Sequence, residues 1–168
     1  QCRESGMSGR PVLVFLHGFP EGAFIWDELL LHFARPENGG YHCIAPYLRG
    51  FGESSSPQAT EAYRAKHLVQ DLIALISTTC PTGTVECLVA HDWGGAVAWN
   101  FANQFPQMAR KLAIINSIND ARSFCFGEKE YYIEVEVSHP LTSKPFFTLK
   151  NKIQTNGSFL VWNFRKFH

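Results

Sequence analysis

The stretch "LVAHDWGGAVAW", residues 88–99, is the part of the sequence that decides the fold. An apolar run suited to a protein interior ends in His91 and Asp92, and two glycines then open a helix-like pattern. The change from a strand-like run to helical spacing predicts a sharp strand-to-helix turn centred on Asp92. Two interpretations of this carboxylate follow: it caps the helix, or it acts as a nucleophile.

Small residues stand two positions before and after Asp92, at Ala90 and Gly94. A sharp turn packs strand and helix so closely that only small side chains fit there, and it lifts the central side chain clear of the sheet. The first helical N–H groups and the positive end of the helix dipole then face the carboxylate, which stays ionised. Such a carboxylate can attack an electrophilic carbon and form an ester. A simple helix cap does not need this frame of small residues, so the frame favours the nucleophile, with the cap as the alternative.

On both sides of this stretch, buried strands alternate with helices. Apolar runs predict strands at 11–16, 41–46, 84–90 and 111–117. Helical spacing of apolar residues predicts helices at 24–33, 62–77 and 94–105. Strands with almost continuous apolar runs, separated by helices, predict the α/β class: a doubly wound, mostly parallel sheet with helices on both faces.

A second motif, "HGFP" at 17–20, follows the first predicted strand. In parallel sheets ligands bind beyond the carboxyl ends of the strands, so this motif and Asp92 are expected at the same edge. The turn at Gly18 lets the backbone N–H of Phe19 face that edge. Together with the N–H of Trp93, it would complete a two-donor oxyanion hole. Pro20 is consistent with a cis bond to Phe19.

Two histidines stand close to these motifs, but neither is predicted to activate water. His17 is interpreted as a structural, hydrogen-bonding residue. His91 directly precedes Asp92, so its side chain should point away from that carboxylate, because side chains alternate along a strand.

The composition predicts one globular domain and excludes several functions. Of 168 residues, 45% are hydrophobic, and 15 Lys and Arg balance 15 Asp and Glu. Without a basic surface, nucleic-acid binding has no electrostatic support, and no apolar run reaches the roughly 18 residues of a membrane span. Five cysteines without a C-x-x-C pair are interpreted as reduced thiols, with no metal site, in a cytoplasmic protein.

The pattern changes after Ser117. Residues 119–168 contain no further strand–helix unit, and we predict an atypical tail with a half-exposed strand near 133–137 and two more at 146–149 and 158–164. The first ten residues look like the end of an earlier strand and its turn. Because residue 1 is Gln, the true start is expected to lie upstream.

Three motifs together resemble the α/β-hydrolase superfamily, in its epoxide hydrolase and haloalkane dehalogenase branch. They are "VLVFLHGFPE" at 12–21, "RGFGESSSP" at 49–57 and "LVAHDWGGAVAW" at 88–99. The resemblance covers about residues 8–118, which we interpret as the N-terminal half of such a core, with 119–168 as the tail. It implies a small epoxide-like substrate and no cofactor.

The resemblance also implies a mechanism. Asp92 attacks a substrate carbon to give an alkyl-enzyme ester, the amides of Phe19 and Trp93 form the oxyanion hole, and a histidine paired with an acid activates the water that releases a diol. "HGFPE" favours the epoxide hydrolases, since haloalkane dehalogenases usually carry Asn in place of Phe19. Haloalkane dehalogenase is the enzyme alternative.

The sequence departs from this family in three respects. Family members usually have Asp or Asn where this chain has Tyr47. They also carry a helical cap after the fourth strand, and later strands carry the acid and the histidine. In this chain, His139 and His168 are the only histidines after Asp92. The base, its acid, the substrate-binding residues and the oligomeric state are therefore left unassigned. We expect an incomplete chain that does not turn over, with a non-catalytic, truncated fragment as the alternative.

Overall fold

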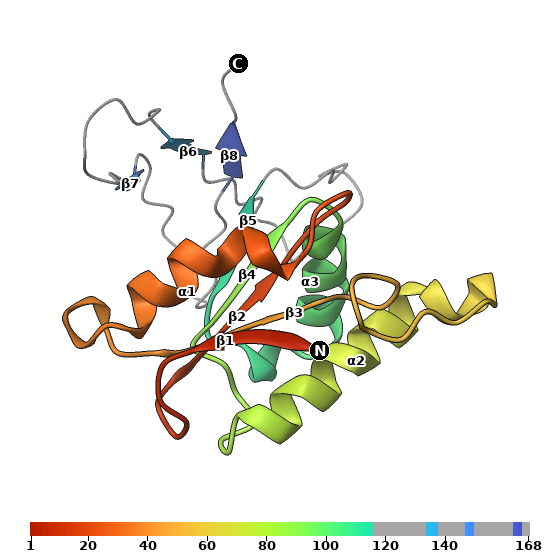
Figure 1. Cartoon of the computed structure of the whole chain (residues 1–168), viewed down its shortest axis with the longest axis horizontal. Coiled ribbons are helices and arrows are strands. Elements are labelled where there is room, and N and C mark those ends of the chain that lie inside the picture. Colours follow the sequence, from red (N-terminus) through yellow and green to blue (C-terminus); the bar gives the residue numbers. More distant parts are fainter. Residues whose placement is uncertain (116–133, 138–146, 150–162, 166–168) are drawn as a thin grey trace.

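A five-stranded, mostly parallel sheet forms the centre of the protein (Figure 1). The computed structural model describes residues 1–115, together with the backbone of 134–137, 147–149 and 163–165. The strand order is β1-β3-β2-β4-β5, in which β3, β2, β4 and β5 run parallel and β1 is an antiparallel edge strand. The bounds are β1 Cys2–Ser5, β2 Val12–Leu16, β3 His42–Pro46, β4 Cys87–His91 and β5 Leu112–Ile115. The predicted fold class is confirmed.

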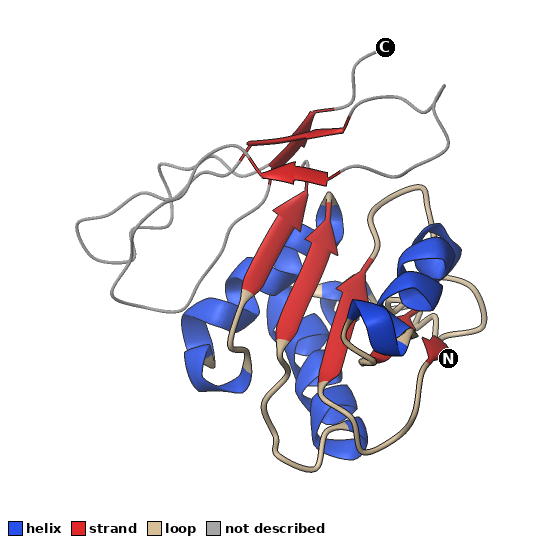
Figure 2. Cartoon of the chain, turned by 90° about the vertical axis from the view of Figure 1, so that its left-hand side faces the viewer, coloured by secondary structure: helices blue, strands red, loops and turns tan. Residues whose placement is uncertain are grey.

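Three α-helices connect the strands: α1 Asp27–Ala34, α2 Ala65–Thr79 and α3 Trp93–Gln104. Helices lie on both sides of the sheet (Figure 2). Two predicted helices begin later than expected, because a short 3-10 helix precedes each of them, Ala23–Trp26 before α1 and Thr60–Tyr63 before α2. Between Thr60–Tyr63 and α2, Arg64 is extended, with ψ of 146°, and this interrupts the helical run. A third and a fourth 3-10 turn lie at Pro36–Asn38 and Pro106–Met108.

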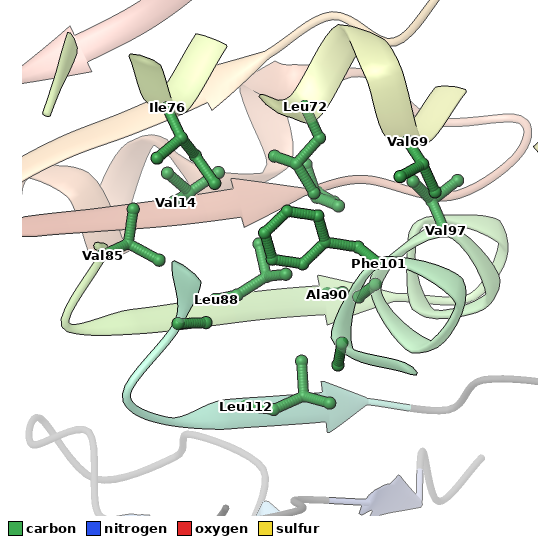
Figure 3. Packing of buried hydrophobic residues seen from close by; sticks show 14 of the residues in the cluster. Val14, Val69, Leu72, Ile76, Val85, Leu88, Ala90, Val97, Phe101 and Leu112 are labelled. Atoms are coloured by element: carbon green, nitrogen blue, oxygen red, sulfur yellow. The ribbon is translucent and has the colours of Figure 1, made fainter. Parts of the chain in front are cut away.

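The buried residues form two clusters, one on each face of the sheet. Strand β2 contributes to both, because Val12, Val14 and Leu16 face one side while Leu13 and Phe15 face the other. The first cluster packs α2 and α3 against the sheet (Figure 3) and includes Val69, Leu72, Ile76, Val97, Phe101, Leu88 and Leu112. The second packs α1 and its 3-10 turn against the other face through Ala23, Trp26 and Leu30. Burial on both faces explains the unbroken apolar runs of these strands.

The strand register brings the two sequence motifs together. Leu16 pairs with Ala90 across the β2–β4 ladder, and both strands run in the same direction. The chain therefore leaves β2 into His17–Pro20 and leaves β4 into Asp92 at neighbouring points of one sheet edge.

Three short strands are described beyond residue 115: β6 Glu134–Val137, β7 Phe147–Leu149 and β8 Asn163–Arg165. They form a separate sheet in the order β7-β6-β8, and each overlaps one of the three strands predicted for the tail. Within the described residues, β5 pairs with β4 alone, so β6 does not extend the central sheet.

The cysteines within residues 1–115 are all free thiols. Cys43 and Cys80 are buried and Cys2 is exposed; Cys125 lies outside the described residues. Among the helices described, none has both the length and the apolar character needed to cross a bilayer. The cytoplasmic location stays a prediction.

Candidate active site

Asp92 occupies a strained turn between β4 and α3. Its φ is 50° and its ψ −117°, and within the described residues it is the sole non-glycine with positive φ. A non-glycine residue held in such a conformation costs about 1–3 kcal/mol, and outliers of this kind concentrate at functional sites. Asp92 stands at the N-cap position of α3, yet its carboxylate makes no capping hydrogen bond within the described part of the chain. The geometry thus gives no support to the helix-cap alternative.

The backbone N–H of Phe19 donates a 3.0 Å hydrogen bond to Oδ1 of Asp92. The Phe19–Pro20 peptide bond is cis, as expected from the sequence. Gly18 is required for this approach, because a Cβ there would lie 2.4 Å from the Cβ and 2.7 Å from Oδ1 of Asp92.

Gly94 explains the small residue on the helical side of the turn. A Cβ at this position would lie 2.6 Å from the carbonyl oxygen of His17 and 2.7 Å from that of Leu16. Helix α3 therefore begins in direct contact with the backbone at the end of β2. Trp93 is the first residue of α3, and first-turn N–H groups have no partner within their own helix.

The His17 side chain is fully buried and both of its ring nitrogens are engaged. Nδ1 lies 2.8 Å from the carbonyl oxygen of Gly18, and Nε2 accepts a 3.0 Å hydrogen bond from the N–H of Leu48. Burial lowers the pKa of His17 below its ordinary value, opposed by the Gly18 carbonyl and the charge of Glu21. The structure confirms His17 as a hydrogen-bonding residue.

A contact that the sequence did not reveal joins Glu21 and His91. Oε2 of Glu21 lies 3.0 Å from Nδ1 of His91. Both atoms are buried and lie within ion-pair distance, but the contact lacks hydrogen-bond geometry. Glu21 directly follows "HGFP" and His91 directly precedes Asp92, but nothing in their spacing along the chain signals that the two side chains meet.

Aromatic side chains cluster on the two loops that meet at this site. The rings of Phe19 and Trp93 stack with centroids 5.4 Å apart and are 59% and 58% exposed. Phe51, from the loop after β3, packs edge-on against Phe19 and against His17. The residue that donates to Asp92 and the residue that follows it thus present an exposed aromatic surface.

Several residues considered in the sequence fall outside the described residues. His139 and His168 are among them, so the structure assigns neither the base nor the acid. In the described part of the chain, no group of three or more His, Cys, Asp or Glu residues is arranged to hold a metal ion.

Comparison with known proteins places these observations in a family. A family model described as the alpha/beta hydrolase fold matches residues 11–145. Epoxide hydrolase 4 of Mus musculus is 37% identical over 137 residues, which are 81% of this chain and 34% of that protein. Epoxide hydrolase A of Mycobacterium tuberculosis is 42% identical over 97 residues, which are 58% of this chain and 29% of that protein.

A solved structure agrees with these sequence matches. The crystal structure of epoxide hydrolase VrEH1 from Vigna radiata superposes with a TM-score of 0.62 and 37% identity, covering 68% of this chain and 33% of that one. The chain spans about a third of the length of these relatives. It belongs to the α/β-hydrolase family, in the epoxide hydrolase branch of that family.

Proposed function

We propose that Asp92 is a nucleophile that opens an epoxide and carries the product as an ester. The observation that supports this most is the pairing of the strained turn at Asp92 with the 3.0 Å hydrogen bond from Phe19 N–H to Oδ1. With a backbone donor aimed at Oδ1, we assign the attack on carbon to Oδ2.

In the first step Oδ2 forms a bond to an epoxide carbon. The carbon–oxygen bond of the ring breaks, its electron pair stays on the epoxide oxygen, and that oxygen takes a proton from an acid or from solvent. Oδ1 becomes the ester carbonyl oxygen and keeps the hydrogen bond from Phe19. The apolar rings of Phe19 and Trp93 offer the uncharged part of the substrate a surface.

In the second step water attacks Cγ of Asp92 and gives its proton to a base. The negative charge that develops on Oδ1 faces the N–H of Phe19, and Trp93 N–H would be the second donor; one such donor typically contributes a factor of about 10²–10³ in rate. Collapse of this intermediate breaks the Cγ–oxygen bond to the alkyl group. The departing oxygen takes the remaining proton of the attacking water, which releases a diol and restores the carboxylate.

We do not assign the base for this second step to His17 or to His91. Both ring nitrogens of His17 are engaged, and His91 contacts Glu21. We therefore propose that the described residues carry out ester formation and not its hydrolysis.

The proposed substrate class is supported by the relatives and by Phe19. The relatives reported above are named as epoxide hydrolases, and Phe19 provides no carboxamide of the kind that helps to bind halide in haloalkane dehalogenases. A small, apolar epoxide is the substrate class that we propose.

The experiment is to incubate the purified chain with an aryl epoxide such as styrene oxide and to measure its intact mass and the diol formed. We expect one stable adduct that peptide mapping places on Asp92, without diol release. Asp92→Asn should prevent the adduct. Asp27→Asn is the matched control, because Asp27 is also a carboxylate at the beginning of a helix and should leave adduct formation unchanged.

Three results would overturn this proposal. Unmodified wild-type protein, with or without diol, would show that Asp92 forms no persistent ester. An adduct retained in Asp92→Asn would place the chemistry on another residue. Halide release from a haloalkane by a chain inert toward epoxides would identify a haloalkane dehalogenase instead.

A further inference from the structure

We propose that His17 is a positioning residue that aims the Phe19 N–H at Asp92 through the peptide group between Gly18 and Phe19. The catalytic meaning of this inference rests on the proposed function of Asp92. The hydrogen-bond arrangement itself does not, and it is testable separately.

The peptide group between Gly18 and Phe19 takes part in two hydrogen bonds, one with His17 and one with Asp92. His17 Nδ1 lies 2.8 Å from the carbonyl oxygen of Gly18, and that carbonyl belongs to the same planar group as the N–H of Phe19. The N–H in turn donates to Oδ1 of Asp92 at 3.0 Å. Because the group is rigid, a donor that holds the carbonyl end also fixes the direction of the N–H end.

The contact with Leu48 fixes which nitrogen of His17 carries the proton. The N–H of Leu48 is a donor and lies 3.0 Å from Nε2, so Nε2 must accept. A neutral imidazole with an accepting Nε2 carries its proton on Nδ1, which faces the Gly18 carbonyl. The two contacts therefore require the same tautomer.

The surroundings keep His17 neutral and immobile. Its side chain is fully buried, and burial lowers its pKa. The ring of Phe51 packs edge-on against it at 4.8 Å between centroids, and the ring of Tyr47 at 6.2 Å. Gly22 and Gly52 leave the space for the Tyr47 ring, since a Cβ on either would lie within 2.9 Å of it.

The resulting chain of contacts runs from Leu48 through His17 and the Gly18–Phe19 peptide to Asp92. Donation from His17 to the Gly18 carbonyl polarises the peptide and strengthens its N–H as a donor, because hydrogen bonds in series reinforce one another. His17 would thus affect the charge on Oδ1 without touching the substrate. Tyr47, at which this chain departs from the family, packs its ring against His17.

Two conservative substitutions separate the two ends of the imidazole. His17→Asn places an amide donor near the Nδ1 position and removes the Nε2 acceptor. His17→Gln places an amide near the Nε2 position and removes the Nδ1 donor. Each variant keeps one hydrogen bond and loses the other, so a purely structural role predicts similar losses of stability and of reaction rate in both.

We expect His17→Gln to form the styrene oxide ester on Asp92 about tenfold more slowly than His17→Asn at equal folded fraction, a part of what removal of a whole donor costs. The matched control is His42, which is also a nearly buried histidine and contacts Glu4 on the far edge of the sheet. His42→Gln should leave the rate of ester formation unchanged. Equal rates in His17→Asn and His17→Gln would overturn the inference.

Nuclear magnetic resonance tests the arrangement without any chemistry at Asp92. In ¹⁵N-labelled wild-type protein, we expect His17 to carry its proton on Nδ1 and the Phe19 amide proton to resonate downfield. His17→Gln should move that amide resonance upfield more than His17→Asn does. A proton on Nε2 of His17 overturns the inference even if neither variant folds. A missing ester on Asp92 with the expected spectra overturns only the proposed function.

Discussion

The N–H of Phe19 and the carboxylate of Asp92 are joined by a hydrogen bond across 73 positions of sequence. The pairing of Leu16 with Ala90 in the β2–β4 ladder brings the two residues together. The positive φ of Asp92 costs free energy locally, but the buried strands and α3 on either side hold the turn in place. The geometry of the site is therefore a property of the sheet rather than of either loop alone.

Gly18→Ala should break the hydrogen bond between the Phe19 N–H and Asp92. The new Cβ would lie 2.4 Å from the Cβ of Asp92, so the loop must move and carry the Phe19 N–H away from Oδ1. We expect ester formation to slow by about 10²-fold and the free energy of unfolding to fall by about 1–3 kcal/mol. Single-turnover mass spectrometry and urea denaturation measure the two effects.

Gly9→Ala is the control for Gly18→Ala. Gly9 has φ of +84° and no atom within 4 Å of an added Cβ, so alanine there costs about 1–2 kcal/mol of backbone strain far from Asp92. Its rate of ester formation should match that of the wild type. A normal rate in Gly18→Ala would show that the loop accommodates a methyl group without moving the Phe19 amide.

Gly94→Ala should destabilise the fold itself. Its Cβ would meet two backbone carbonyl oxygens at 2.6 and 2.7 Å, and neither can move without separating α3 from β2. We expect the free energy of unfolding to fall by at least about 1–3 kcal/mol, despite the higher helix propensity of alanine. Asn103→Ala, at an exposed position of the same helix, should change it by no more than about 0.5 kcal/mol. Equal stability of the two variants in urea would contradict this account of the turn.

Much of the core could be predicted from the sequence, because its signals are local. Continuous apolar runs such as Val12–Leu16 mark strands buried on both faces, and β2 does contribute to both clusters. The small residues around Asp92 predicted a tight turn, and the steric contact at Gly94 is the physical reason for one of them.

What the sequence did not predict depends on contacts between distant segments. Glu21 and His91 meet because β2 and β4 are neighbours, and no local pattern encodes their approach. The sequence marks Tyr47 as a departure from the family, but it does not show that the Tyr47 ring packs against His17. The late start of α2 depends on the extended backbone of one residue, Arg64, which helical spacing of side chains does not reveal.

Cys43 and Cys87 should be unreactive in the folded protein. Burial raises the pKa of each thiol to about 12, so at pH 8 only about one in 10⁴ is thiolate, and the thiolate is the reactive form. We expect iodoacetamide to leave both unmodified in the native state and to modify both in urea, as measured by peptide mapping. Cys2 is exposed and serves as the internal control that the reagent is active. Modification of Cys43 at the rate of Cys2 would show that β3 opens under native conditions.

The pH dependence of stability should reveal His17. Burial lowers the pKa of this side chain in the folded protein below its ordinary value of 6.5, so as the pH falls below about 6.5 the unfolded chain takes up a proton that the folded chain does not. Proton uptake stabilises the unfolded state relative to the folded state, so the free energy of unfolding falls until the pH reaches the lower, folded pKa. A protonated Nε2 would also face the N–H of Leu48, two donors in contact.

We therefore expect wild-type stability in urea to decrease between pH 7 and pH 5 more steeply than that of His17→Asn. The variant keeps every other titratable group, including Glu21 and Tyr47 beside the site, so the difference between the two profiles isolates His17. Above pH 7, His17 is neutral in both the folded and the unfolded chain. The free energies of unfolding of His42→Gln and of the double variant His42→Gln/His17→Gln should therefore differ there by an amount that does not change with pH. Parallel profiles of wild type and His17→Asn from pH 7 to pH 5 would show that His17 titrates alike in the folded and unfolded chain, and that its burial does not hold it neutral.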